Sequence, residues 1–354
     1  MQNHTPKICL IGHSLATGGA ERAMAALSRF FSSRGIAVHV VTVVDEIQYP
    51  FEGELINLGK CESRLQKLKT LYKYLRQHKF DFIIDFRMRP GFFQEWLTAR
   101  FLYNAPTVYA VHSAKIDWYL PKSVLLARLI YGGSYRIVTV SKGIEDLLEP
   151  YGLPLTAIPN PIDFDQISRL SMETVQTESF ILAVGRMDDD VKQFDKLIRA
   201  YADSDLPFQN IRLVILGDGK HRQSLKQLAA ELNVPVSIDG AVANPYPWFK
   251  NARFTVLCSK TEGLPTVLLE SLACGTPVVS FDCKTGPAEI VRDGENGMLV
   301  PDQDFEALTH AMNWMAQNEE FREACRQNAF HGLEKFHLEN VGRAWLELLK
   351  IDLY

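Results

Sequence analysis

The sequence predicts an α/β protein made of two doubly wound domains. Three observations lead to this prediction: short β-branched runs alternate with longer amphipathic segments, the alternation occurs twice, and a proline-rich passage separates the two series. A length of 354 residues suits about two domains, and a hydrophobic share of 47% can fill a core in each. These features exclude a small disulfide scaffold, a fibrous repeat and a disordered tail.

The first series lies before residue 160. Its strand candidates are nearly continuous apolar runs, which are typical of parallel sheets covered on both faces. The segments between them have helical periodicity. We expect strands at residues 7–11, 38–44, 82–85, 107–111 and 136–140, and helices at 21–33, 64–79, 92–102 and 123–131.

Pro159 and Pro161 mark the boundary between the two series, because proline disfavours helix at its own position and just before it. We place a first domain at residues 1–160, a second domain at 161–335, and a helix at 336–354 that packs back toward the first domain. Ligands of doubly wound folds bind at the carboxyl ends of the strands, so we expect chemistry in a cleft where the domains face each other. The second series predicts strands at 180–184, 213–216, 254–258 and 277–281, and helices at 194–201, 222–232, 266–274 and 305–315.

A glycine-rich turn follows the first expected strand. Gly18 and Gly19 stand at the start of the next helix, where the backbone can approach a ligand closely and free N–H groups favour a phosphate. An ordinary βα turn with Glu21 as a first-turn acid explains the same residues equally well. The turn has neither the G-x-G-x-x-G pattern nor a P-loop lysine, which argues against a dinucleotide-dependent oxidoreductase and against an NTPase.

Two glutamates flank a Gly-Leu-Pro turn in the second domain. Glu262 is expected at the carboxyl end of a strand, and Glu270 roughly one turn into the following helix. Carboxylates can accept hydrogen bonds from the hydroxyls of a sugar and a ribose, and amides of the turn can reach a diphosphate. Taken singly, Glu262 is also explained as a capping acid and Glu270 as a surface residue.

The segment from Glu262 to Glu270 resembles the E-x7-E pattern of retaining nucleotide-sugar glycosyltransferases with the GT-B fold, and it is most similar to that of family GT4. Further motifs of that family follow in order along nearly the whole chain. They are Gly18-Gly19-Ala20-Glu21-Arg22, Pro159-Asn160-Pro161-Ile162-Asp163, Val184-Gly185-Arg186 with Lys192, Leu216-Gly217-Asp218-Gly219, and Glu289-Ile290-Val291 to Gly297.

The resemblance implies that residues 1–160 form an acceptor-binding domain and residues 161–335 a nucleotide-sugar-binding domain, and it also implies how the donor binds. Glu262 would bind hydroxyls of the transferred sugar, with the backbone amides of Gly263, Leu264 and Pro265 beside the sugar and the diphosphate. Glu270 would hold the ribose.

The resemblance also assigns two cations to the leaving group. Arg186 and Lys192 would neutralise the departing diphosphate, the role that a metal has in other transferases. The family usually has Lys-Gly where this chain has Lys192-Gln193, which leaves the position of Lys192 less defined. Alternatively, both cations pair with the acidic run at residues 188–190, which we interpret as a solvated loop and not as a metal site.

His112 and Val242 complete the implied site. Similar transferases have a histidine at the position of His112, at the end of a strand of the first domain and near the primary hydroxyl of the sugar. A histidine at a strand end is as often hydrogen-bonded and structural. Val242 falls where related enzymes grip the base through backbone atoms.

The reaction that the resemblance implies is transfer of a hexose or N-acetylhexosamine from a nucleotide sugar, with UDP expected as the nucleotide, to an acceptor hydroxyl with retention of configuration. The diphosphate itself would help to take the proton, so no protein nucleophile, cofactor or metal is expected. Two alternatives stay open: a GT-B epimerase or phosphorylase, for which no pyridoxal-type lysine context is found, and a non-catalytic module that binds sugar nucleotides.

The charge is unevenly distributed. The total is −4, which argues against nucleic acid as a partner. Residues 1–160 hold 19 Lys and Arg against 13 Asp and Glu, a net charge of +6, while the remainder carries −10. The helix at 64–79 is basic and contains no acid, and its apolar stripe is expected to face its own sheet.

The basic first domain suggests the acceptor. We expect a membrane glycolipid, such as lipopolysaccharide core or a lipid-linked oligosaccharide, and an anionic membrane surface that meets the basic helix. The loops at 87–93 and 118–122 add aromatic and basic side chains that could reach lipid or sugar. No leader, spanning segment or metal-like cysteine spacing is found, so a cytoplasmic protein with free thiols, peripheral to the inner face of the cytoplasmic membrane, is expected.

Overall fold

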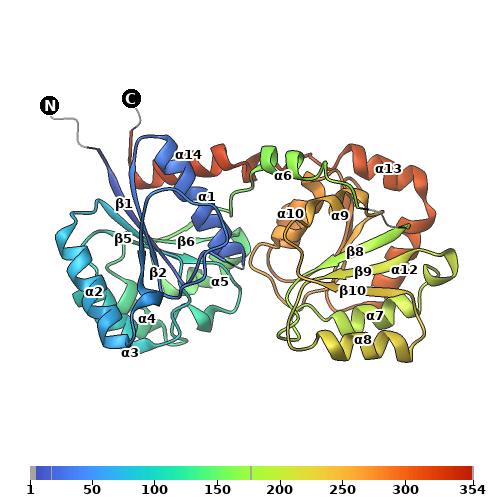
Figure 1. Ribbon diagram of the computed structural model, residues 1–354, viewed down its shortest axis with the longest axis horizontal. Helices are drawn as coiled ribbons and strands as arrows, with labels where there is room; N and C mark the ends of the chain where they lie inside the picture. Colours follow the sequence, from blue (N-terminus) through green and yellow to red (C-terminus); the bar gives the residue numbers. More distant parts are fainter. Residues whose placement is uncertain (1–4, 17, 176–177, 353–354) are drawn as a thin grey trace. The chain divides into compact units, whose positions relative to one another are not determined.

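The computed structural model describes residues 5–16, 18–175 and 178–352. The chain divides into two compact units: unit 1 is Met1–Ile162 with Lys335–Tyr354, and unit 2 is Asp163–Glu334. Each unit is built on a parallel β-sheet with helices packed against it (Figure 1). The prediction of two doubly wound α/β parts is confirmed.

The strands of unit 1 have the order β3-β2-β1-β4-β5-β6-β7, and every neighbouring pair is parallel. The strand order changes direction between β1 and β4. The carboxyl ends of these two strands therefore form a switch point, where ligands of doubly wound sheets bind. The strands are β1 (Lys7–Gly12), β2 (Ala37–Thr42), β3 (Glu54–Asn57), β4 (Phe82–Asp85), β5 (Thr107–Val111), β6 (Arg136–Thr139) and β7 (Leu155–Ala157).

The last helix, α14, follows unit 2 in the chain but packs on α1 of unit 1. Gly342 permits this close approach, because a Cβ at that position would lie 2.4 Å from the ring of Phe30. Trp345 of α14 is buried in the same core. The helices of unit 1 are α1 (Gly19–Ser33), α2 (Arg64–Gln77), α3 (Phe92–Leu97) with a π-helical turn (Thr98–Leu102), α4 (Val124–Tyr131), α5 (Lys142–Leu148) and α14 (Leu338–Leu349).

The strands of unit 2 have the order β10-β9-β8-β11-β12-β13, again all parallel, with the switch point between β8 and β11. Ile181 and Phe180 of β8 belong to different core clusters, because alternate side chains of a strand point to opposite faces. Both faces of this sheet are thus covered. The strands are β8 (Phe180–Val184), β9 (Arg212–Leu216), β10 (Val236–Gly240), β11 (Thr255–Leu257), β12 (Val278–Asp282) and β13 (Gly297–Pro301).

The helices of unit 2 that follow β8 and β11 begin at the switch point and position its loops. These are α7 (Phe194–Ala202) and α10 (Thr266–Ala273). The other helices of the unit are α6 (Phe164–Leu170), α8 (Arg222–Glu231), α9 (Tyr246–Asn251), α11 (Pro287–Ile290), α12 (Phe305–Gln317) and α13 (Glu319–Gln327).

The expected burial of α2 is wrong in part. Leu71 and Leu75 are buried, as the amphipathic pattern predicts. Leu65, Leu68 and Tyr72 are instead 61%, 47% and 50% exposed. The apolar stripe is wider than the face that the sheet covers, and part of it stays on the surface.

The expected thiols and membrane segments can be compared with the structure directly. All six cysteines are free. In the part of the chain that the structure describes, no helix is both long enough and apolar enough to cross a bilayer.

Candidate active site

The carboxyl ends of β8 and β11 lie next to each other at the switch point of unit 2. The loop after β8 carries Lys192, and the loop after β11 carries Glu262. The Nζ of Lys192 donates to Oε1 of Glu262 across 2.6 Å, and the two side chains are only 18% and 13% exposed. The structure thus joins two predicted site residues where a doubly wound sheet binds ligands.

Two glycines make space for the loop that carries Lys192. A Cβ at Gly185 would lie 3.0 Å from Cε of Lys192, so the lysine stem passes directly along the backbone. Gly217 has a φ of +144°, and a Cβ there would lie 1.9 Å from the carbonyl oxygen of Gly185. The loops after β8 and β9 can come this close only because residue 217 has no side chain.

Gln193 stands where the family usually has glycine, and the structure shows how a glutamine can occupy this position. Its φ of 51° and ψ of 39° lie in the left-handed region that glycine adopts most easily. Its Nε2 donates to the carbonyl oxygen of Cys258 across 2.8 Å, and the residue is 2% exposed. The buried hydrogen bond links the loop of Lys192 to the end of β11.

The turn after Glu262 is supported by the loop after β12. The Thr285 hydroxyl donates to the carbonyl oxygen of Glu262. Gly286 has a φ of +98°, and a Cβ there would lie 2.6 Å from Cδ of Pro265 and 2.9 Å from the Gly263 carbonyl oxygen. Only glycine lets the two loops pack against each other here, which fixes the path of the Gly-Leu-Pro turn.

Helix α10 begins directly after this turn, with Pro265 as its N-cap and no side-chain cap. The N–H of Leu268 donates to the carbonyl oxygen of Pro265 at 3.0 Å, whereas the N–H groups of Thr266 and Val267 have no partner within the helix and, together with the helix dipole, favour an anion. The predicted amide contribution of Pro265 is wrong for a chemical reason, because proline has no N–H. The amides of Gly263 and Leu264 remain as donors in the turn.

Glu270 lies in the middle of α10 and is 3% exposed. The interpretation of this residue as a surface glutamate is therefore wrong. A carboxylate at this depth needs hydrogen bonds from its surroundings.

The alternative in which Arg186 and Lys192 both pair with the acidic run at residues 188–190 does not describe the structure. Lys192 pairs with Glu262, and Asp190 forms an ion pair with Lys260. Arg186 is exposed and has no hydrogen-bond or ion-pair partner among the described residues. Its cation is therefore available to a ligand. Val242 is half-buried and packs against the core of one sheet face, with its backbone in the loop after β10.

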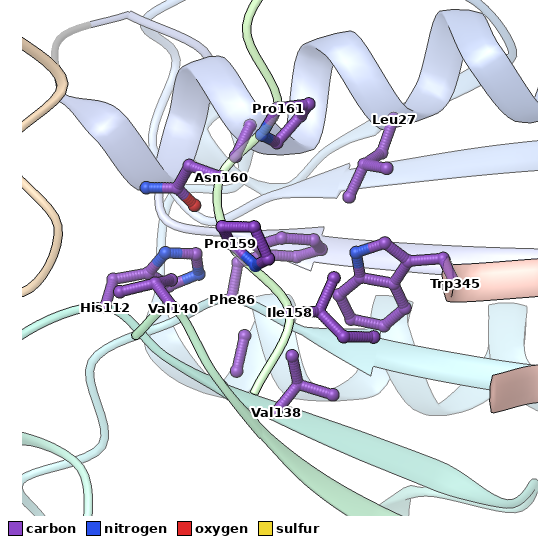
Figure 2. A pocket seen from close by; sticks show the side chains of 12 residues that line it. Leu27, Phe86, His112, Val138, Val140, Ile158, Pro159, Asn160, Pro161 and Trp345 are labelled. Atoms are coloured by element: carbon purple, nitrogen blue, oxygen red, sulfur yellow. The ribbon is translucent and has the colours of Figure 1, made fainter. Parts of the chain in front are cut away.

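His112 lies directly after β5 in unit 1 and lines a cavity of about 10 Å³ (Figure 2). Its ring stacks on that of Phe86, with 5.5 Å between the centroids. Both ring nitrogens are buried, and among the described residues Asn160 is the side chain that interacts with the ring by hydrogen bonding, without ideal geometry. Burial lowers the pKa of His112 to about 3, and the positive charge of Arg89 acts in the same direction. The interaction with Asn160 opposes both effects, because it favours the protonated ring. The imidazole is therefore neutral at physiological pH.

The glycine pair of unit 1 stands at the start of α1. Gly18 is the N-cap, with a φ of +123° and no side-chain cap, and α1 begins at Gly19. A Cβ at Gly18 would lie 2.5 Å from Oε2 of Glu21. Glycine is thus required by local geometry whether or not a phosphate binds. Thr17 of the same turn lies outside the described residues.

Arg87 was a candidate for contact with lipid or sugar, and its ion pairs within unit 1 make this prediction wrong. Its guanidinium donates to both carboxylate oxygens of Asp85, at 3.0 and 2.7 Å, and to Glu95 at 3.1 Å. The Tyr103 hydroxyl adds a hydrogen bond to Asp85 at 2.8 Å. Although burial alone would raise the pKa of Asp85, Arg87 and Arg89 hold it below its usual value. Asp85 is a buried carboxylate with all its charge compensated inside unit 1.

Arg89 is buried, so the prediction that it contacts lipid or sugar is also wrong. Its guanidinium donates to the carbonyl oxygens of Arg87 at 2.6 Å and Ala110 at 3.0 Å, which joins the loop after β4 to β5. It also lies over three tyrosine rings at 5.1, 5.4 and 5.8 Å from the centroids, those of Tyr109, Tyr119 and Tyr131. The residue holds the strand ends that carry Phe86 and His112.

Comparison with known proteins identifies the family. The family model described as Glycosyltransferase Family 4 matches residues 17–166, and the model Glycosyl transferases group 1 matches residues 166–332. A Campylobacter jejuni protein, N-acetylgalactosamine-N,N'-diacetylbacillosaminyl-diphospho-undecaprenol 4-alpha-N-acetylgalactosaminyltransferase, is 30% identical over 366 residues, which cover 97% of this chain and 99% of the relative. The chain belongs to the family 4-like glycosyltransferases.

Other relatives of this glycosyltransferase agree with that assignment. The Escherichia coli lipopolysaccharide 1,6-galactosyltransferase is 28% identical over 186 residues, about half of each chain (50% and 51%). The structure of Anabaena HepE in complex with UDP and glucose superposes with a TM-score of 0.79 at 19% identity, covering 99% of this chain and 100% of the other. The GT-B fold predicted from the motifs is confirmed.

Three residues of the enzyme escape the sequence motifs but shape the site: Thr285, Gly286 and Gln193. Thr285 and Gly286 lie in the loop after β12, far from Glu262 in sequence, and only the parallel order β11-β12 brings them together. The signal for Gln193 was present in the sequence, since it replaces a usual glycine. Its left-handed backbone shows why the position matters.

Proposed function

We propose that the enzyme transfers a hexose or N-acetylhexosamine from a UDP-sugar to a hydroxyl group of a membrane glycolipid, with retention of configuration. The observation that carries this proposal is the Lys192–Glu262 contact at the switch point of unit 2, beside the amino end of α10. A cation, a carboxylate and N–H groups lie together there, and this set of groups supports the proposal because it suits a sugar diphosphate. The names of the relatives support the acceptor class: one acts on a diphospho-undecaprenol glycan and another on lipopolysaccharide.

In the proposed reaction, the acceptor oxygen attacks the anomeric carbon, and the bond from that carbon to the diphosphate oxygen breaks. The acceptor proton passes to the departing diphosphate. Lys192 and Arg186 neutralise the charge that develops on that group, and α10 adds its N-terminal N–H groups. No protein nucleophile is part of this proposal.

The remaining donor contacts follow from the same arrangement. Glu262 accepts hydrogen bonds from hydroxyls of the sugar, while the amides of Gly263 and Leu264 donate to the diphosphate. Glu270, buried in α10, holds the ribose, and the backbone at Val242 contacts the base. Binding energy spent on these contacts orients the anomeric carbon for attack.

In unit 1, we propose that His112 contacts the primary hydroxyl of the transferred sugar and that Gly18 and Gly19 lie close to the donor. His112 suits this role because neither of its buried ring nitrogens makes a hydrogen bond of good geometry, so a ligand hydroxyl can still bind there. A neutral imidazole can accept one hydrogen bond and donate another. We also propose that the basic face of α2 meets an anionic membrane, on the cytoplasmic side where nucleotide sugars are available.

The test begins with the donor. Thermal shift with UDP-, GDP- and ADP-sugars should show stabilisation by a UDP-sugar, because a ligand that binds only the folded state raises the melting temperature. The selected donor is then assayed for transfer to lipid extracts. Absence of stabilisation by every nucleotide sugar would favour a non-catalytic module that binds another ligand.

Isosteric variants then test the site. Glu262→Gln should lower kcat/KM by about 10²- to 10³-fold, since it removes charge at the sugar without changing shape. Glu270→Gln should weaken the thermal shift by UDP. Glu231→Gln, at the exposed end of α8, is the matched control and should behave as wild type. Normal transfer by both site variants would contradict the proposed assignment.

A further inference from the structure

We propose that unit 1 inserts an apolar surface of α2, α3 and α4 into the interfacial region of an anionic bilayer. The inference rests on the proposed function, in which the acceptor is a membrane glycolipid, and it adds the side chains that enter the membrane. The surface is defined by six of its most exposed apolar side chains. They are Leu68 and Tyr72 of α2, Phe93 of α3, Phe101 of the π-helical turn, and Leu125 and Leu129 of α4, between 47% and 78% exposed.

Exposed apolar side chains are concentrated in this part of the chain. Of the 16 large hydrophobic side chains that are exposed among the described residues, 11 lie between residues 65 and 129. The elements that carry them contact one another: the π-helical turn contacts α2, α3 and α4, and α3 contacts α4 (Figure 1). Contiguous exposed apolar area of this kind marks a binding surface, because soluble domains rarely leave it open to water.

The aromatic side chains of the surface form an ordered row. Phe93, Leu97 and Phe101 are spaced by four residues, which places them on one side of the helical segment. Trp96 lies between the two phenylalanines, stacked on Phe93 at 6.1 Å and edge-on to Phe101 at 5.8 Å. Arg100 donates to the Leu129 carbonyl oxygen at 2.9 Å and thereby joins the row to α4. The surface is therefore preorganised by contacts within unit 1.

The charges around this surface commit it to an anionic partner. Helix α2 carries five basic residues and no acid, and Lys69, Lys73 and Arg76 share one face of it by their spacing. The π-helical turn and α4 contribute Arg100 and Arg128, again without an acid. The one acid of these elements, Glu95, is buried and paired with Arg87.

A bilayer containing anionic lipid satisfies both parts of the surface at once. Basic residues gain about 1 kcal/mol each near anionic headgroups, and aromatic and leucine side chains gain by leaving water at the interface. The two parts respond differently to salt. Salt screens the attraction of the lysines and arginines but leaves apolar insertion intact.

Co-sedimentation with vesicles of phosphatidylcholine and phosphatidylglycerol tests the proposal. The wild type should bind at low salt and keep part of its binding at high salt. The double variant Phe93→Ser/Phe101→Ser should bind roughly tenfold more weakly at low salt and lose binding at high salt. Phe208→Ser, which changes an 88% exposed phenylalanine of unit 2, is the matched control and should bind as wild type. Circular dichroism establishes that each variant is folded.

Depth of insertion is measured by tryptophan fluorescence with brominated phospholipids in the same vesicles. Bromine quenches tryptophan that enters the bilayer, so wild-type fluorescence should fall on binding. Trp96→Phe should remove most of this quenching while it preserves vesicle binding. Quenching that is absent in the wild type, or unchanged in Trp96→Phe, would show that the aromatic row stays outside the membrane.

Four outcomes separate this inference from others. Binding that salt abolishes completely and that Phe93→Ser/Phe101→Ser leaves unchanged would assign membrane attachment to the basic face alone and overturn insertion. Self-association of the wild type in sedimentation velocity, lost in the double variant without any vesicle binding, would identify the surface as a contact between copies. Sugar transfer to a detergent-dispersed glycolipid with no vesicle binding would support the proposed function and overturn insertion. Insertion without consumption of any nucleotide sugar would support insertion and overturn the proposed function.

Discussion

Both units have charged side chains at the switch point of a parallel sheet, but the charges of the two units differ in how many partners they have inside the protein. In unit 1, Asp85 and Arg89 are fully buried, and Arg87, with 15% of its side chain exposed, pairs with both Asp85 and Glu95, so each charge is compensated internally. In unit 2, Lys192 and Glu262 have similar exposures of 18% and 13%, but the ion pair that the structure gives them is the one with each other. A charged residue after a strand is therefore not by itself a binding residue. What distinguishes the two sets is how many internal partners each charge has.

The largest effect is expected from breaking the buried cluster of unit 1. Asp85→Asn removes the negative charge that compensates the buried guanidinium of Arg89 and the nearly buried one of Arg87, and an uncompensated buried charge costs about 3–5 kcal/mol. We expect the free energy of unfolding in urea to fall by that amount. The matched control, Lys142→Ala, breaks the exposed ion pair between Lys142 and Glu145 and should leave stability unchanged. Equal stability of wild type and Asp85→Asn would mean that this cluster is not a structural element.

The second prediction concerns the corresponding pair of unit 2. Lys192→Met should lower kcat by about 10²- to 10³-fold, because a cation that stabilises the leaving diphosphate is lost. Its effect on the free energy of unfolding should be smaller than that of Asp85→Asn, because Glu262, unlike Asp85, is not completely buried and water can reach its carboxylate. Lys260→Met, which removes the exposed partner of Asp190, is the control and should preserve activity. A large loss of stability with full kcat in Lys192→Met would show that the Lys192–Glu262 pair is structural, like the cluster of unit 1, and does not act on the substrate.

The comparison also shows how far the sequence predicts the fold. The expected central strands are present within two residues of their predicted bounds, because buried parallel strands are continuous apolar runs. The four strands that were not predicted, β3, β7, β10 and β13, are the edges of the two sheets. Edge strands are only partly buried and lack such a run, so their pairing depends on the neighbouring strand and not on local sequence.

The candidate site was predictable as a set of residues but not as a set of contacts. Motif spacing indicated Lys192 and Glu262, and their 2.6 Å contact depends on the order of β8 and β11 in the sheet. Arg87 and Arg89 were indistinguishable from ligand-binding arginines in sequence. Their partners Asp85, Glu95 and three tyrosines come from five separate segments, which only the folded chain brings together.

The third prediction is a pH dependence that comes from His112. Its pKa is lowered from 6.5 to about 3, first by burial and then by the charge of Arg89. Between these values the unfolded chain binds a proton that the folded chain does not, so stability falls as pH falls below about 6.5 and is constant above it. At about pH 5 the loss is about 2 kcal/mol. Urea unfolding of wild type and His112→Gln at neutral pH and at about pH 5 measures it.

The wild type and His112→Gln share all other titrating groups. The difference between their pH-dependent losses of stability therefore measures the contribution of His112. His112→Gln should lose about 2 kcal/mol less than wild type on acidification. Parallel pH dependence in the two proteins would mean that His112 is protonated in the folded state. That result would also remove the argument that a neutral imidazole contacts the substrate.

The smallest effect is expected at Gln193, whose left-handed backbone lies beside Lys192. A side chain in this region costs roughly 1–2 kcal/mol relative to glycine, whereas the buried hydrogen bond to Cys258 contributes about 1 kcal/mol. Gln193→Ala keeps the backbone cost and loses the bond; Gln193→Gly loses both. We therefore expect Gln193→Gly to be close to wild type in urea unfolding and Gln193→Ala to be about 1 kcal/mol less stable than either. Equal stability of the alanine and glycine variants would mean that the backbone here is not strained, and the usual glycine of the family would then need another reason, such as close approach of the substrate.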